Sequence, residues 1–218
     1  MSSYRLVIFD MDGTILDTLT DLSNAVNHTL KHFGYPERTQ QEIRSFLGNG
    51  SRYLIEKSLP ANNAVIPTKL ELLLDYYNSY YKENCAVHTK PYKGIWELLL
   101  KLKHENKLIA VVSNKPDFGV QELCQHHFPN LFDFACGERT GIRRKPAPDS
   151  VQEVMQRLKV AGKEAVYIGD SEVDISTAQN AGLEAIIVTW GFRDADQLIK
   201  AGAPRLVSSI QELEKILL

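Results

Sequence analysis

The sequence is poor in cysteine and lacks any long apolar run. Its 218 residues include three cysteines, Cys85, Cys124 and Cys136, which are odd in number and far apart. They match neither a disulfide framework nor the spacing of a zinc site, so we predict a reducing, cytoplasmic location. The longest apolar run is far shorter than the roughly 20 residues that cross a bilayer, which argues against a membrane protein.

An excess of charge of one sign is also missing. The chain has 25 Lys and Arg against 27 Asp and Glu, a formal net charge of -2. Such a chain has no general attraction to nucleic acid or to anionic membranes, so we predict neither as a partner. The N-terminus lacks a basic-then-apolar signal pattern, because Asp10 and Asp12 follow almost at once. With 44% hydrophobic and 24% charged residues, the composition is that of a folded protein.

Five short apolar runs predict β-strands. Most are continuously apolar rather than alternating, which is typical of strands covered on both faces in a parallel sheet. Helical spacing of apolar residues lies between them, so the order of elements predicts an α/β doubly wound parallel-sheet core with right-handed crossovers. The runs are residues 5–9, 108–113, 132–136, 165–168 and 185–189.

The interval between the first two runs, residues 10–107, is far longer than one crossover needs. Its apolar residues recur at helical spacing in three stripes, of which the third is rich in tyrosine. We interpret the tyrosine stripe as core packing. The pattern predicts an inserted all-helical cap domain, residues 17–86, and a discontinuous α/β core domain of residues 1–16 and 87–218.

Reactive side chains follow four of the predicted strands, where open α/β sheets bind their ligands. Paired carboxylates attract a hard divalent cation, and Mg²⁺ commonly takes one or two carboxylates together with phosphate. A carboxylate can also act as a nucleophile, and a neighbouring acid can protonate the leaving oxygen. A hydroxyl and a lysine can hold and neutralise phosphate oxygens. The pattern suits phosphoryl transfer, and the side chains are Asp10, Asp12, Ser113, Asn114, Lys145, Asp170 and Asp174.

Four ordered motifs resemble those of the haloacid dehalogenase-like phosphohydrolases. The resemblance covers nearly the whole chain, including the helical cap after the first motif. It implies that Asp10 is the nucleophile and Asp12 the acid/base. It also implies that Asp10, the Asp12 backbone carbonyl and Asp170 bind Mg²⁺. Asp174 would orient the metal shell. The motifs are Asp10-x-Asp12-Gly13-Thr14, Ser113-Asn114-Lys115, Lys145-Pro146 and Gly169-Asp170-x₃-Asp174.

Longer stretches resemble phosphoglycolate phosphatases within this family, so we expect a phosphatase whose substrate is a small phosphorylated metabolite such as 2-phosphoglycolate. The sequence departs from the common pattern at Met11, where many members have phenylalanine, and at Gly137-Glu138, where a glycine pair followed by an acid is frequent. The similar stretches are Leu47-Gly48-Asn49-Gly50, Ser113-Asn114-Lys115-Pro116, Arg144-Lys145-Pro146-Ala147-Pro148, Gly169-Asp170-Ser171-Glu172-Val173-Asp174 and Thr189-Trp190-Gly191-Phe192-Arg193.

Two features of the predicted cap have more than one interpretation. Gly48-Asn49-Gly50 can expose backbone N–H groups to a substrate carboxylate, or it can form an ordinary turn between helices. Arg52, just inside the next helix, is either a carboxylate partner or a surface charge. His28 and His32 have a metal-binding spacing, but no third ligand is in view, so we predict that they are surface helix residues.

Other functions fit part of the pattern. A sugar phosphomutase, a pyrophosphatase or a nucleotidase of the same superfamily has the same core motifs. A non-catalytic phosphoacceptor module also combines an α/β sheet with acidic residues, a hydroxyl and a lysine. It is much shorter, however, and has no place for a helical insert. The oligomeric state is left open between monomer and homodimer.

Overall fold

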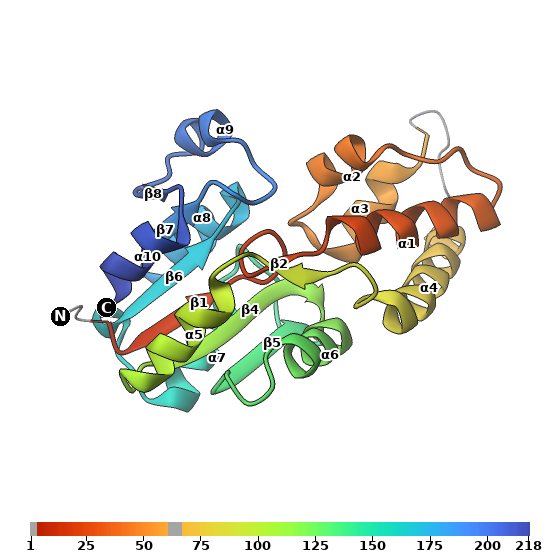
Figure 1. Cartoon of the computed structure of the whole chain (residues 1–218). Helices are drawn as coiled ribbons and strands as arrows, with labels where there is room; N and C mark the ends of the chain where they lie inside the picture. Colours follow the sequence, from red (N-terminus) through yellow and green to blue (C-terminus); the bar gives the residue numbers. More distant parts are fainter. Residues whose placement is uncertain (1–3, 61–66) are drawn as a thin grey trace.

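A six-stranded parallel sheet forms the centre of the computed structural model, which describes residues 4–60 and 67–218 (Figure 1). The strand order is β5-β4-β1-β6-β7-β8. The chain therefore builds outward from β1 in both directions, and the order reverses between β4 and β6, where such sheets bind ligands. The strands are β1 (Leu6–Phe9), β4 (Leu108–Pro116), β5 (Phe134–Glu138), β6 (Ala165–Gly169), β7 (Glu184–Val188) and β8 (Leu206–Val207).

Helices cover both faces of this sheet, which confirms the doubly wound α/β class. Alternate residues of β1 enter separate apolar clusters: Val7 and Phe9 pack with α5, α6 and α10, whereas Leu6 and Ile8 pack with α7, α8 and α9. A strand buried on both faces needs a continuous apolar run, which is the pattern seen in the sequence. The helices are α5 (Ile95–His104), α6 (Asp117–His127), α7 (Asp149–Leu158), α8 (Glu172–Ala181), α9 (Ala195–Lys200) and α10 (Ile210–Leu217).

Four helices fill the long interval after β1, and we call them the helical insert. They lie beyond the carboxyl ends of the strands (Figure 1). Tyr77 and Tyr81 of α4 are buried in the apolar cluster, as the tyrosine stripe predicted. No helix among the described residues has the length and apolar character needed to cross a membrane. The insert consists of α1 (Leu19–His32), α2 (Gln40–Phe46), α3 (Gly50–Ser58) and α4 (Pro67–Asn84).

The two histidines of α1 pack against tyrosines of α4. The His28 ring stacks on Tyr80 with a centroid separation of 3.9 Å, and the His32 ring stacks on Tyr76 at 4.0 Å. Within residues 4–60 and 67–218, neither histidine belongs to a group that can hold a metal. Both histidines are exposed on α1, as predicted for surface helix residues.

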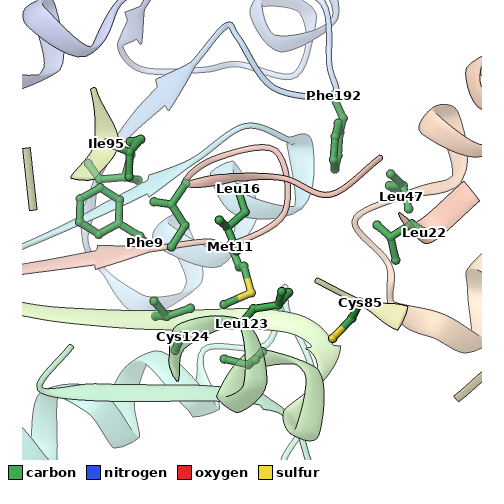
Figure 2. Close-up of a cluster of buried hydrophobic side chains, with 14 of the residues drawn as sticks. Phe9, Met11, Leu16, Leu22, Leu47, Cys85, Ile95, Leu123, Cys124 and Phe192 are labelled. Atoms are coloured by element: carbon green, nitrogen blue, oxygen red, sulfur yellow. The ribbon is translucent and has the colours of Figure 1, made fainter. Parts of the chain in front are cut away.

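Apolar side chains join the insert to the sheet domain. Figure 2 shows Met11 and Leu16, which follow β1, in one cluster with Leu22 and Leu47 of the insert and with Phe192. Met11 is fully buried. A flexible apolar side chain therefore fills the position where phenylalanine is common, and thioether side chains adapt readily to such sites.

Both connections to the insert run side by side. β2 (Leu16–Asp17) pairs with β3 (Lys90–Pro91) as a short antiparallel ribbon that the sequence did not predict. Asp21, only 2% exposed, accepts hydrogen bonds from the backbone N–H groups of His88 and Thr89. One buried carboxylate of α1 thus fixes the segment by which the chain returns to the sheet.

Replacing Asp21 tests this connection. Asp21→Ala leaves the buried N–H of Thr89 and the partly buried N–H of His88 without their acceptor, and is expected to lower the free energy of unfolding by about 2–4 kcal/mol. Asp21→Asn keeps one acceptor oxygen and should cost roughly half as much. Urea unfolding measures both, with the exposed Asp75→Asn of α4 as a control that changes stability little. Equal stability of Asp21→Ala and the control would contradict this role.

Candidate active site

Three buried carboxylates meet at the point where the strand order reverses. Asp10 follows β1, Asp170 follows the neighbouring strand β6, and Asp174 lies in the first turn of α8. One oxygen of each lies within 4.8 Å of the others. Parallel pairing of β1 with β6 makes this convergence unavoidable, because both strands end at the same edge of the sheet.

Asp174 is fixed by the turn that begins α8. Its Oδ2 accepts hydrogen bonds from the backbone N–H groups of Asp170 and Ser171 and from the Ser171 hydroxyl, at 3.2, 3.1 and 2.6 Å. A carboxylate at a helix N-terminus is also stabilised by the helix dipole. Asp174 therefore holds the loop that carries Asp170, in addition to facing the carboxylate cluster itself.

Lys145 is the cation of this cluster. Its Nζ lies 2.9 Å from Asp10 Oδ1, 2.8 Å from Asp174 Oδ1 and 3.0 Å from the Tyr167 hydroxyl. Burial alone lowers the pKa of the ammonium, but the carboxylates of Asp10 and Asp174 outweigh burial and hold the pKa well above its usual value. Lys145 is consequently charged throughout the physiological range.

The cluster holds more negative charge than one lysine offsets. Burial raises the pKa of Asp10 to about 7, while the Lys145 ammonium opposes this rise. Burial, together with the neighbouring Asp174 and Asp10 carboxylates, raises the pKa of Asp170 well above its usual range. A divalent cation would relieve both effects. Apart from its ion pair with Lys145, the buried Asp10 Oδ1 has no hydrogen-bond partner, so it is available to a cation. The candidate ligands are all carboxylate oxygens, which suit Mg²⁺ better than zinc.

Two glycines let the backbone enclose Asp170. A Cβ atom on Gly13 or on Gly191 would collide with the Asp170 carboxylate, and Gly13 also has a positive φ of 84°. The backbone N–H of Phe192 donates to Asp170 Oδ2 at 2.6 Å, and the Thr14 hydroxyl donates to Oδ1 at 3.3 Å. Gly13 of the first motif therefore has to be glycine because Asp170 of the fourth motif packs against it.

Asn114 of β4 ties three segments together. Its side-chain N–H groups donate to the carbonyls of Gly48 and Lys145, each at 3.0 Å, and its Oδ1 accepts from the Lys145 backbone N–H at 2.8 Å. Both donors of the amide are therefore occupied in this arrangement. Ser113 precedes it on β4, lines the cavity and is buried.

A cavity of about 40 Å³ lies between the carboxylate cluster and the insert. On this scale a water molecule needs roughly 10–15 Å³, so the cavity is small. Its walls include groups from the sheet domain and from α1, α3 and α4 of the insert. Of the residues predicted from sequence, it is lined by Asp10, Asp12, Ser113, Asn114, Lys145, Asp170, Gly48 and Gly50.

The predicted cap residues separate into two groups. Gly48 and Gly50 line the cavity, and both have the positive φ that favours glycine. Asn49 is not part of the lining. Arg52 is exposed and pairs with Glu71 of α4 at 2.6 Å, outside the cavity. The structure therefore does not bring Arg52 to the carboxylate cluster.

Arg193 is a site residue to which the sequence assigned no role. Its guanidinium makes two hydrogen bonds to Glu172 and donates to the carbonyls of Leu47 and Arg44, at 2.7 and 3.2 Å. It follows β7 and lines the cavity, so it fastens the end of α2 to the sheet domain. Arg193 belongs to a stretch that resembles phosphoglycolate phosphatases, Thr189-Trp190-Gly191-Phe192-Arg193, which could have marked it as a site residue. The stretch does not show which groups Arg193 contacts.

Lys115 lines the cavity and Tyr81 contacts it, and the sequence predicted no site role for either residue. Lys115 Nζ lies 2.9 Å from Asp12 Oδ1 and donates to the Tyr81 hydroxyl at 2.7 Å. The lysine stood in the second motif, and the tyrosine stood in the stripe that we interpreted as core packing. Nothing in the sequence joins the two, because 34 positions separate them.

This arrangement of strand-end carboxylates, lysine and inserted helices defines a known class of hydrolase. The chain belongs to the haloacid dehalogenase-like hydrolase family, whose model matches residues 7–188. It is similar to a protein named phosphoglycolate phosphatase from Colwellia psychrerythraea, with 30% identity covering 96% of this chain and 95% of the relative. Another of that name, from Aquifex aeolicus, is 31% identical over 86% of each chain. The chain is thus a phosphatase of this family.

Solved structures agree with the fold. A crystal structure titled putative phosphoglycolate phosphatase from Lactobacillus delbrueckii subsp. bulgaricus superposes with a TM-score of 0.91 at 40% identity, covering 100% of this chain and 99% of the other. A predicted phosphoglycolate phosphatase from Haemophilus somnus gives a TM-score of 0.92 at 24% identity, covering 100% of both chains, and supports the fold alone. Membership of this family excludes the non-catalytic phosphoacceptor alternative.

The Arg193 contacts predict that this residue holds residues 44–50 of the insert against the sheet domain. Arg193→Met removes the donors that hold the carbonyls of Arg44 and Leu47. We expect amide hydrogen exchange in residues 44–50 to become at least about tenfold faster, because local opening then costs about 1.4 kcal/mol less. Arg157→Met, on the surface of α7, is the matched control. Unchanged protection of residues 44–50 in Arg193→Met would show that Arg193 does not fasten the insert.

Proposed function

We propose that this enzyme hydrolyses a small phosphate monoester, with Asp10 as the nucleophile and Mg²⁺ as the cofactor. The observation that carries this proposal is the convergence of Asp10, Asp170 and Asp174 on Lys145 at the switch point of the sheet. The names of the relatives support 2-phosphoglycolate as the substrate.

In the first half-reaction, an oxygen of Asp10 forms a bond to phosphorus as the ester P–O bond breaks. Asp12, two residues further along the same loop, donates its proton to the leaving oxygen. Lys145, held between Asp10 and Asp174, orients the nucleophile and offsets the charge of the phosphoryl group. The product of this step is an aspartyl phosphate and a free alcohol.

In the second half-reaction, Asp12 takes a proton from water, whose oxygen attacks phosphorus. The bond between phosphorus and Asp10 then breaks, which releases inorganic phosphate and restores the Asp10 carboxylate, while the proton taken from water restores the acid form of Asp12. Ser113 lies within β4 and lines the cavity, where its hydroxyl can donate to a phosphoryl oxygen. Asn114 contributes indirectly, because it fixes the backbone of Lys145.

Mg²⁺ would be held by Asp10, Asp170 and the backbone carbonyl of Asp12, with Asp174 orienting the loop that carries Asp170. When bound, it supplies positive charge that neutralises the phosphoryl oxygens. The raised pKa values of Asp10 and Asp170 support this assignment, since buried carboxylates that lack enough positive charge are those that a cation stabilises.

We also infer that residues 17–86 act as a cap domain on a core of residues 1–16 and 87–218. The cavity between them has a volume of about 40 Å³ and is lined by groups of both parts, which supports exclusion of bulk water from the phosphoryl group.

Asp10→Asn tests the nucleophile. An amide cannot form the acyl phosphate, so phosphate release from 2-phosphoglycolate is expected to fall at least about 1000-fold. Mass spectrometry of the wild-type enzyme quenched during turnover should find the phosphoryl group on Asp10. Asp75→Asn, an exposed carboxylate of α4, serves as the control and should turn over normally. A wild-type rate of phosphate release in Asp10→Asn would show that Asp10 is not the nucleophile.

Removal of the metal provides an independent test. Saturating Mg²⁺ is expected to raise the Tm by about 5–10 °C, because a ligand at 100 times its Kd stabilises the folded state by about 2.7 kcal/mol. Asp170→Asn should abolish this shift, whereas Asp75→Asn should retain it. EDTA should stop phosphate release, and Mg²⁺ should restore it. A Tm shift that persists undiminished in Asp170→Asn would place the metal elsewhere.

A further inference from the structure

Lys115 is a second buried cation at the cavity, and the proposed chemistry leaves it without a task. Its side chain is 1% exposed, and it lines the cavity. Lys145 already serves the nucleophile Asp10, whereas Lys115 contacts Asp12, the acid/base. Burying an ammonium group costs several kcal/mol unless its partners compensate, so its position calls for an explanation.

The two lysines differ in how many donors they use. An ammonium group has three N–H donors. Lys145 has three partners, namely Asp10, Asp174 and Tyr167. Within the described part of the chain, Lys115 Nζ has only two polar partners, Asp12 and Tyr81. A buried ammonium with a donor to spare at the wall of a cavity can bind an anion there.

Packing holds the Lys115 side chain in one place. A Cβ atom on Gly119 of α6 would lie 3.2 Å from Lys115 Cδ and 3.4 Å from Cγ, so the stem packs closely against the backbone of this glycine. The ammonium also lies 4.7 Å from the centre of the Tyr81 ring, which stacks on Tyr77. A group held this firmly loses little conformational entropy when it binds a ligand.

The position of Lys115 relative to Asp12 defines what it can bind. Asp12 protonates the leaving oxygen, so a cation 2.9 Å from Asp12 lies beside the leaving group rather than beside the phosphoryl group. An anionic group one carbon away from the ester oxygen lies within reach of this cation. Arg52, the carboxylate partner considered from sequence, lies outside the cavity and cannot take this part.

We propose that Lys115, held by Tyr81 of the insert, binds the carboxylate of a phosphate ester whose leaving group is a short hydroxy acid. This inference rests on the proposed function and adds the residues that select the substrate. Tyr81 belongs to α4, so the carboxylate site is complete only when the insert lies against the sheet domain. The contact between the insert and the sheet domain therefore both encloses the cavity and completes the site that binds the leaving group.

The test compares two esters of equal length, 2-phosphoglycolate and 2-hydroxyethyl phosphate, which lacks the carboxylate. Lys115→Met keeps the length of the stem and removes the charge. Because Lys115 also contacts Asp12, both esters can lose activity. We expect the ratio of kcat/KM for 2-phosphoglycolate to kcat/KM for 2-hydroxyethyl phosphate to fall about 10- to 100-fold, mainly through the KM for 2-phosphoglycolate. Tyr81→Phe should produce a smaller loss with the same selectivity. Lys101→Met, a surface lysine of α5, is the control.

Folding of each variant is checked by urea unfolding and by the Mg²⁺-dependent Tm shift, which reports on Asp10 and Asp170 rather than on Lys115. Equal losses for both esters would overturn the inference, because Lys115 would then only position Asp12. Absence of any loss would overturn it as well. A wild-type enzyme that hydrolyses both esters without preferring 2-phosphoglycolate contradicts the inference alone. A wild type that cleaves neither ester contradicts the proposed function too.

Discussion

The ion pairs of Lys145 with Asp10 and Asp174 are the interaction on which the rest of the site depends. They bring together side chains that follow β1, β5 and β6, and Asn114 of β4 adds the backbone of Lys145 to the same network. Without this cation, the buried carboxylates would repel one another and take up protons. With it, the cluster keeps enough negative charge to hold a divalent cation.

The insert is built to meet this cluster at defined points. Arg193 holds the carbonyls at the end of α2, Asn114 holds the carbonyl of Gly48, and Lys115 holds the hydroxyl of Tyr81. Each contact joins a side chain of one part to a group of the other. Because the partners lie on α2, on the loop that follows it and on α4, only one orientation of the insert satisfies all of them.

The sequence predicted the sheet well because strands buried on both faces need uninterrupted apolar runs, and those runs are visible without any tertiary information. It did not predict β2, β3 or β8, since two residues carry no periodic signal. The motif carboxylates and Lys145 were predictable because strand ends share one edge of the sheet. Lys115, Tyr81 and Arg193 were not, since their roles depend on which groups face them across the boundary with the insert. Arg52 was predicted as a site residue because it is close to Gly50 in sequence, but it lies outside the cavity.

The short ribbon of β2 and β3, fixed by Asp21, places the entry to the insert and the exit from it next to each other. A segment attached in this way can be exchanged for another of different length without disturbing the sheet, since both ends stay where they are. The carboxylates that we propose as catalytic belong to the sheet domain, whereas the proposed carboxylate site is shared between Lys115 of β4 and Tyr81 of the insert. On this proposal, exchange of the insert during evolution can change the substrate while the reaction chemistry is inherited intact.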